Sequence, residues 1–226
     1  MNIDIITLFP KMLQAFFEES ILKKAIEKGI VNVHLHDLRN FAAEKAGRKQ
    51  VDDYAYGGGA GMVLMPEPIF NALEAIKQER TPDEVIFLTP DGEVLSQATA
   101  NQLSLQKNLV LICGRYKGID ERIRKYYVTK EISIGDYVLT GGEIPAAALC
   151  DAVIRLIPGV MSDESSALSD SFQAELLDAP VYTRPRIFNG HEVPEVLFSG
   201  NHRKINDWRH EQSLEKTQKR RPDLLD

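Results

Sequence analysis

Cysteine is scarce in this sequence. Only Cys113 and Cys150 occur among 226 residues, and each lies within an apolar run. They form no CxxC pair and no disulfide framework, and a pattern of this kind is typical of buried thiols in a reducing compartment. We therefore expect a cytoplasmic protein.

Long hydrophobic runs are also missing. No apolar stretch approaches the roughly 20 residues that a membrane-spanning helix needs. The N-terminal stretch "MNIDIITLFP" has no basic region before its apolar residues and no small-residue cleavage site. It predicts a first strand rather than a signal peptide, and we expect no membrane partner.

The chain has no overall excess of basic residues. Its 27 lysines and arginines face 33 acidic residues, so the formal net charge of -6 argues against a nucleic-acid partner. The distribution is uneven, however, because residues 201–221 carry a charge of +4 and the remainder -10. The alternative is a solvated helix with pairs such as Glu215 and Lys219, and charge alone slightly favours it.

Several familiar catalytic motifs are absent. The glycine-rich stretch "YGGGAGM" (56–62) lacks the GK[ST] ending of a phosphate loop, and the first strand runs into Phe9-Pro10 instead of a dinucleotide fingerprint. No G-x-S-x-G elbow occurs, which argues against nucleophilic hydrolysis. His34 and His36 share one strand face without a third ligand, so zinc is a weak interpretation and we assign no metal ligands.

What the sequence does contain is an alternation of strands and helices. Strands are predicted at 2–8, 31–37, 84–90, 108–114 and 128–134, and helices at 10–28, 66–77, 96–106, 119–127 and 143–157. This order indicates an α/β fold with a mainly parallel sheet. Residues 38–62 are polar and then glycine-rich, and they predict one long functional loop.

The composition changes at Pro158. The stretch "SDESSALSDS" is small, polar and acidic, which is typical of a linker. We expect a sheet domain at 1–160, a flexible linker at 161–171, and a small helical module at 172–226.

Three loops at strand ends suggest a ligand site. They read "LTPDG" (88–92), "GRYKGID" (114–120) and "IGDYVLTGG" (134–142). Ligands of open α/β sheets bind outside the carboxyl ends of the strands. Glycine, proline and small residues in three such loops predict a tight, mostly neutral pocket lined by backbone, suited to an adenosyl ligand such as S-adenosylmethionine. The alternative is three tight turns without a ligand.

Seven stretches of this chain resemble one family. They are "FPKM", "YGGGAGM", "CGRYKGIDERI", "ISIGDYVLTGGEIP", "DAVIRLIPGV", "VPEVLFSGNHRKI" and "KRRPDLL", and the family is the bacterial tRNA (guanine-N1)-methyltransferases. The likeness extends from the first strand to the C-terminus. Ala60 stands where the family pattern has proline, "LTPDG" stands where serine and glutamine are expected, and "SDSF" (169–172) is the main anchor of the linker.

The resemblance implies a function and a fold. The function is methylation of N1 of guanine 37, 3′ to the tRNA anticodon, which limits frameshifting. The fold is that of the knotted (SPOUT) methyltransferases, with a C-terminal trefoil knot near residues 86–142 that holds S-adenosylmethionine, followed by the small helical domain. The family is homodimeric, with active sites shared between subunits.

The resemblance also assigns cofactor contacts by position. They are Leu88, Thr89, Pro90, Gly114, Tyr116, Gly118, Ile134, Gly135, Asp136, Tyr137, Val138, Leu139, Gly141, Gly142 and Pro145.

Two polar residues acquire catalytic roles through the resemblance. Asp170 is implied as the base that takes the N1 proton, and Arg155 as the cation that stabilises charge on guanine O6. On sequence alone, Asp170 would be an ordinary solvated linker residue and Arg155 part of a helix-face ion pair.

The anticodon stem-loop is the implied partner, since single-stranded RNA loops are the usual targets of sequence-specific reading. The expected RNA contacts are Arg48, Lys49, Gly57, Gly58, Gly59, His202, Arg203, Trp208, Arg209, Lys216, Lys219 and Arg220. Two rival functions remain open: a related knotted methyltransferase acting on another RNA site, and a non-catalytic RNA-binding protein.

Overall fold

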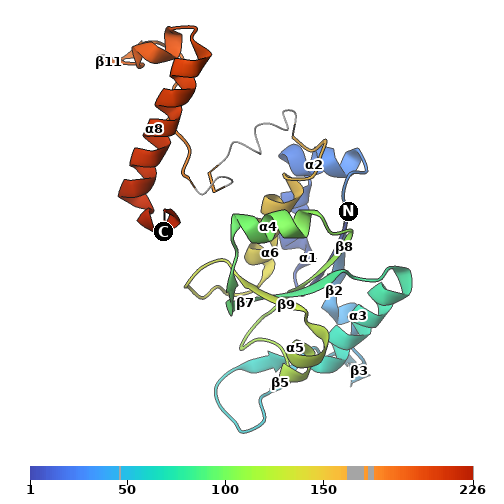
Figure 1. The fold of residues 1–226 in the computed structure, drawn as a ribbon. Helices are drawn as coiled ribbons and strands as arrows, with labels where there is room; N and C mark the ends of the chain where they lie inside the picture. Colours follow the sequence, from blue (N-terminus) through green and yellow to red (C-terminus); the bar gives the residue numbers. More distant parts are fainter. Residues whose placement is uncertain (46, 162–170, 173–175, 226) are drawn as a thin grey trace. The chain divides into compact units, whose positions relative to one another are not determined.

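The structure is a computed structural model of the chain (Figure 1). It describes residues 1–225 except 46, 162–170 and 173–175. The chain divides at residue 162 into two compact units, and each is described by itself.

The first unit alternates strands and helices as the sequence predicts. Its strands are β1 (Asn2–Thr7), β2 (Asn32–Asp37), β3 (Glu44–Lys45), β4 (Arg48–Lys49), β5 (Asp52–Tyr54), β6 (Met62–Leu64), β7 (Glu84–Val94), β8 (Asn108–Cys113) and β9 (Lys130–Ser133). Its helices are α1 (Pro10–Phe17), α2 (Ser20–Glu27), η1 (Leu38–Phe41), α3 (Pro66–Glu79), α4 (Gln97–Ser104), α5 (Glu121–Tyr127) and α6 (Glu143–Ile154).

Five of the strands form one parallel sheet in the order β2-β1-β8-β7-β9. Strand β1, which has a neighbour on each side, is almost wholly buried, and its Ile5 lies between Leu35 and Leu111 of the neighbouring strands. A near-continuous apolar strand needs cover on both faces, which parallel sheets receive from their crossover helices. The predicted α/β class with a mainly parallel sheet is confirmed.

Helices cover both faces of the sheet. Ile3 and Ile5 point to the face that α1, α2, α4 and α6 cover, whereas Ile6 points to the face beneath α3 and α5. Figure 1 shows the sheet between these two helical layers. Successive strand residues alternate between the faces, so each layer has its own apolar core.

Three sequence predictions were wrong in this unit, and two of them concern residues 10–62. The predicted single helix at 10–28 is two helices, because Glu19 is extended and Ser20 has a positive φ of 59°. The predicted long loop at 38–62 contains η1 and two short hairpins, β3–β4 and β5–β6. The side chain of Asp37 starts η1 by accepting a hydrogen bond from the Arg39 amide.

The sequence predicted a strand that ends at Pro90, but β7 does not end there. It continues to Val94, and its pairing with β9 shifts register between Leu88 and Glu93. The residues between these two positions leave the regular ladder and form the first of the three predicted loops. The bulge thus places a loop in the middle of a strand, at the edge of the candidate site.

The second unit combines a long helix with short elements. These are β10 (Ile187–Phe188), β11 (His191–Glu192), η2 (Glu195–Phe198), α8 (His202–Arg220) and η3 (Pro222–Leu224). The Asn201 side chain caps α8 by accepting from the Lys204 amide. The buried Thr217 hydroxyl donates to the Ser213 carbonyl and accepts from the Leu177 amide, which ties α8 to the preceding segment. Among the described residues, no helix has the length and hydrophobicity to cross a bilayer.

Candidate functional site

The loop within β7 and the loops that follow β8 and β9 enclose a cavity of about 410 Å³. This volume lies in the range of small-molecule sites. The chain passes from β7 to β8 on one side, and β9 then lies on the other side of β7. A reversal of strand order of this kind leaves a crevice at the strand ends.

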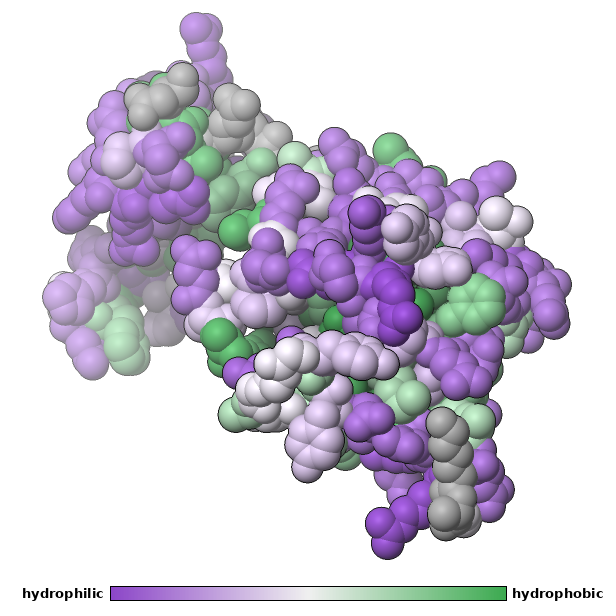
Figure 2. Space-filling view, turned by 90° about the horizontal axis from the view of Figure 1, so that it is seen from below, coloured by the Kyte–Doolittle hydropathy of each residue, from purple (hydrophilic) through white to green (hydrophobic). Residues whose placement is uncertain are grey.

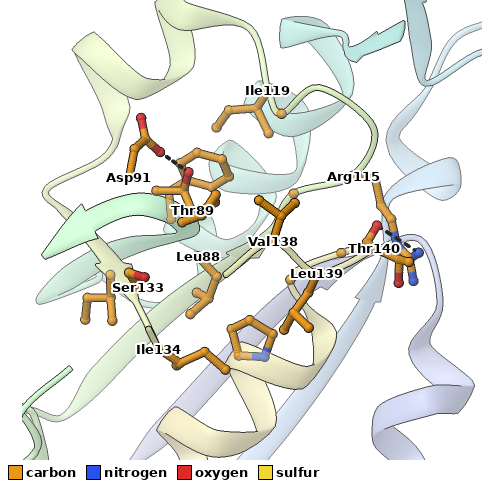
Figure 3. A pocket seen from close by; sticks show the side chains of 18 of the residues that line it. Leu88, Thr89, Asp91, Arg115, Ile119, Ser133, Ile134, Val138, Leu139 and Thr140 are labelled. Atoms are coloured by element: carbon orange, nitrogen blue, oxygen red, sulfur yellow. Dashed lines mark hydrogen bonds between the residues drawn. The ribbon is translucent and has the colours of Figure 1, made fainter. Parts of the chain in front are cut away.

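The expected cofactor residues gather around this cavity, and Figure 3 shows how ten of the lining residues lie. Every residue expected to contact the cofactor lines the cavity except Asp136. Asp136 belongs to the same loop as Gly135 and Tyr137, but it is not part of the wall.

The third loop folds back on itself. Gly135 has a positive φ of 145°, its carbonyl accepts hydrogen bonds from the Ser133 hydroxyl and the Tyr137 amide, and the Tyr137 hydroxyl donates to the Ile134 carbonyl. A Cβ on Gly135 would lie 2.5 Å from the Tyr137 ring. This position requires glycine for both backbone angle and space.

The end of this loop packs on the second loop. The Gly142 amide donates to the Gly114 carbonyl at 2.9 Å, and Gly141 pairs with Arg115 in an antiparallel bridge. A Cβ on Gly142 would lie 2.6 Å from Cys113 Cα. The second and third loops are therefore in backbone contact, which only a residue without a side chain permits.

The second loop is also held by the hairpin β5–β6. The Lys117 amide donates to the Met62 carbonyl, and the Leu64 amide donates to the Gly118 carbonyl. Tyr116 at the cavity wall has a positive φ of 60°. A hydrogen bond to the Asp52 carboxylate raises the pKa of Tyr116. The glycine-rich hairpin and the cavity thus form one connected structure.

Two charged residues of the cavity wall, Asp91 and Arg124, are paired with each other. The Thr89 hydroxyl donates to Asp91, and Arg124 donates to the same carboxylate at 2.8 Å and to Glu131 at 2.6 Å. The hydrogen bond from Thr89, and then that from Arg124, lowers the pKa of Asp91.

Some wall residues were not predicted. They are Phe87, Asp91, Arg115, Lys117, Ile119, Arg124, Ile132, Ser133 and Thr140. Asp91, Arg115 and Lys117 lie inside the motifs "LTPDG" and "GRYKGID", so membership of a strand-end loop was the available signal. Arg124 lies on α5, where nothing in the local pattern distinguishes it from an exposed helix residue.

Of the two expected catalytic residues, Arg155 does not line the cavity of this chain. Arg155 is the C-cap of α6, whereas Gly142 and Pro145 at the other end of this helix face the cavity. The helix separates these ends by roughly 20 Å, at 1.5 Å per residue. Asp170 lies outside the described residues.

The expected RNA contacts fall in three places. Arg48 and Lys49 are exposed on β4, and Gly57 to Gly59 form an exposed turn of positive φ between β5 and β6. On α8, His202, Arg203, Arg209, Lys219 and Arg220 are exposed. Trp208 packs near Tyr182, and Lys216 donates to the Asp178 carbonyl, so these two side chains also have contacts within their own unit. The face shown in Figure 2 is largely hydrophilic, with separate apolar patches.

Other reactive groups are engaged in structural contacts. Burial raises the pKa of both the Cys113 and the Cys150 thiols, so neither supplies a thiolate. His36 contacts the buried Asp4 carboxylate at 2.7 Å. In the part of the chain that the structure describes, no three histidine, cysteine or acidic side chains form a group that could hold a metal.

Comparison with known proteins gives a consistent result. The model of the family described as tRNA (Guanine-1)-methyltransferase TrmD matches residues 1–226. Proteins named tRNA (guanine-N(1)-)-methyltransferase are similar over at least 94% of their length. Those of Christiangramia forsetii and Bacteroides thetaiotaomicron are each 58% identical over 226 residues, which is 100% of this chain. The match covers 99% of the first protein and 100% of the second. That of Cytophaga hutchinsonii is 59% identical over 224 residues, covering 99% of this chain and 94% of its own.

Proposed function

Because the chain belongs to the tRNA (guanine-1)-methyltransferase family, we propose that it methylates N1 of guanine 37 of tRNA with S-adenosylmethionine and so limits frameshifting. The observation that carries this proposal is the full-length match together with a formed cavity at the strand ends. A full-length match favours guanine N1 over the rival RNA sites, and a formed cavity disfavours a non-catalytic RNA-binding protein.

The cavity suits this methyl donor. Its wall combines backbone groups of Gly114, Gly141 and Gly142 with the apolar side chains of Leu88 and Leu139. Backbone donors and acceptors can read an adenine edge, and apolar side chains can enclose its faces. When bound, the donor supplies an electrophilic methyl group on a sulfonium.

The chain must also make guanine N1 nucleophilic. N1 carries a proton at neutral pH, and we assign its removal to the Asp170 carboxylate, which takes the proton as the N1–methyl bond forms and the sulfonium bond breaks. Loss of the proton places negative charge on O6, where the Arg155 guanidinium stabilises it. The target base leaves its stack for this reaction, as bases that undergo chemistry must.

A homodimer with shared active sites accounts for the placement of Arg155. This residue lies about one helix length from the cavity of its own chain, so a partner subunit is the simplest way to bring it to a cavity. Apolar side chains around the cavity are available for such an interface, since Val138 is 83% exposed and Ile144 is 55% exposed. Large exposed apolar side chains of this kind mark association sites.

The remaining assignments follow from the family. We propose that the three loops form its trefoil knot, and the contact of Gly142 with Gly114 supports this. We also propose the division into a methyltransferase domain at 1–160, a linker at 161–171 and a tRNA-binding domain at 172–226. The exposed basic side chains of α8 support the last assignment.

The test is methyl transfer to a transcript. Labelled S-adenosylmethionine is incubated with the protein and an anticodon stem-loop carrying guanine 37, beside one carrying adenine 37. We expect label in the first RNA only, at N1. Equal labelling of both RNAs, or of neither, would refute the proposed substrate.

A further inference from the structure

A buried carboxylate lies behind the cavity wall, and the chemistry above does not use it. Glu143 is the first residue of α6, and its side chain is 2% exposed. The Thr7 hydroxyl donates to its Oε1 at 2.7 Å, and Arg115 Nη2 lies 3.0 Å from its Oε2. One side chain thus joins the end of β1, the loop after β8 and the start of α6.

Arg115 extends this link to the cavity. Its Nη1 donates to the Thr140 carbonyl at 3.1 Å, as Figure 3 shows, and the residue pairs with Gly141. Its guanidinium also lies 4.4 Å from the centroid of the Phe9 ring. The position of Arg115 therefore sets the position of the Thr140–Gly141 backbone.

Gly141, Arg115 and Glu143 are closely packed. A Cβ on Gly141 would lie 2.3 Å from Arg115 Nε and 2.6 Å from Glu143 Oε2. The Thr7 hydroxyl is itself fixed, since it accepts from the Phe9 amide at 2.9 Å. A change in the carboxylate must therefore move either the arginine or the glycine loop.

Stability alone is a weak reason for this ion pair. Removing two charges from water offsets much of their attraction, and apolar side chains of similar volume often stabilise a core as well. A better reason for the ion pair is that it supports the cavity wall from behind. A binding site works only when packed and hydrogen-bonded neighbours hold its geometry.

We propose that Glu143 is a positioning residue for methyl transfer: through Arg115 it holds the Thr140–Gly142 loop in the shape that binds the adenosyl methyl donor. The inference rests on the proposed function. It predicts that removing the charge weakens donor binding and leaves tRNA binding unchanged.

The experiment compares Glu143→Gln and Thr7→Val with the wild-type protein. Calorimetry with S-adenosylmethionine and with S-adenosylhomocysteine gives the donor-site Kd, and steady-state kinetics give KM and kcat. For Glu143→Gln we expect a Kd and a donor KM raised about tenfold, because the buried ion pair with Arg115 is lost. We expect a smaller rise for Thr7→Val. The kcat at saturating donor and the KM for tRNA should stay near wild type.

Asp4→Asn is the matched control. Asp4, which lies on β1, is also a buried carboxylate paired with an arginine, since Arg80 donates to it at 2.9 Å. It does not line the cavity. This variant should lower the melting temperature without changing the donor Kd. An unchanged Kd in Glu143→Gln, or an equal rise in Asp4→Asn, would overturn the proposal.

Two further outcomes are decisive. If Glu143→Gln does not fold, the test is made with Thr7→Val, which keeps the ion pair of Glu143 and Arg115. A wild-type donor Kd in Thr7→Val would then count against the proposal. If the wild-type protein binds neither adenosyl ligand, the proposed function itself fails, and this inference fails with it.

Discussion

Gly141 and Gly142 are adjacent at the cavity wall, but they face different neighbours. A Cβ on Gly141 would meet the side chains of Arg115 and Glu143, whereas one on Gly142 would meet the backbone of Cys113. Side chains can move aside at the expense of the pocket, but backbone in a buried strand cannot. The two positions should therefore respond differently to the same small substitution.

We predict that Gly141→Ala keeps the fold and weakens S-adenosylmethionine binding at least tenfold. Gly142→Ala should lower the free energy of unfolding by about 1–3 kcal/mol, as overpacking does, and weaken binding as well. Chemical denaturation and calorimetry measure the two quantities. Equal unfolding free energies for the two variants would contradict this account.

A second residue-scale prediction concerns acid stability. Burial alone would raise the pKa of Asp4, but hydrogen bonds from His36 and Arg80 and their charges lower it below its ordinary 3.8. The unfolded chain therefore takes up this proton at a higher pH than the folded chain. The stabilisation is present above the unfolded pKa and is lost as the pH falls through the folded pKa.

Asp4→Asn should consequently destabilise the protein by about 3 kcal/mol at neutral pH, since it leaves Arg80 without its buried partner. The difference between variant and wild type should shrink as the pH falls below about 4. Urea denaturation at several pH values measures it. A difference independent of pH would show that the charge of Asp4 does not stabilise the fold.

At the scale of the element, α8 has basic residues of two kinds. Lys216 donates to the Asp178 carbonyl, and Arg221, which follows the helix, pairs with Asp223 at 2.6 Å. Lys219 and Arg220 are exposed. The last two are therefore the better candidates for phosphate contact.

We predict that Lys219→Gln with Arg220→Gln weakens tRNA binding and makes the slope of log K against log salt shallower by about 1.5, because fewer counterions are released. The donor Kd should not change. Lys24→Gln with Lys28→Gln on and after α2 removes the same charge from exposed positions and serves as the control. An equal change of slope in both variants would mean that α8 contributes only net charge.

At the scale of the whole molecule, the proposed dimer makes a prediction about mixed subunits. If each active site combines Asp170 of one chain with the Gly141 cavity of the other, Asp170→Ala and Gly141→Val should each be inactive alone. Co-expression in equal amounts gives about half mixed dimers, and each of these has one intact site. About a quarter of the wild-type activity should return.

Native mass spectrometry provides the control by showing that mixed dimers are present. If they are present and activity stays at background, each site lies within one chain and the shared-site proposal fails.

The sequence by itself determined the class of fold, most elements of the main sheet and the loops of the pocket. Apolar strands that alternate with helices predicted the α/β class. A strand covered by helices on both faces has a near-continuous run of apolar residues, and this run can be seen in the local sequence. The glycines at 135, 141 and 142 marked the third loop, because positive φ and close backbone approach both select that residue.

Only the tertiary structure decided which remote residues meet. Nothing near Glu143 in the sequence indicates Thr7 or Arg115, since their contact depends on β1 and β8 lying side by side in the sheet. The same holds for the hairpin β5–β6 against the second loop. Local patterns specify strands and turns, but the order in which strands pair is a property of the whole chain.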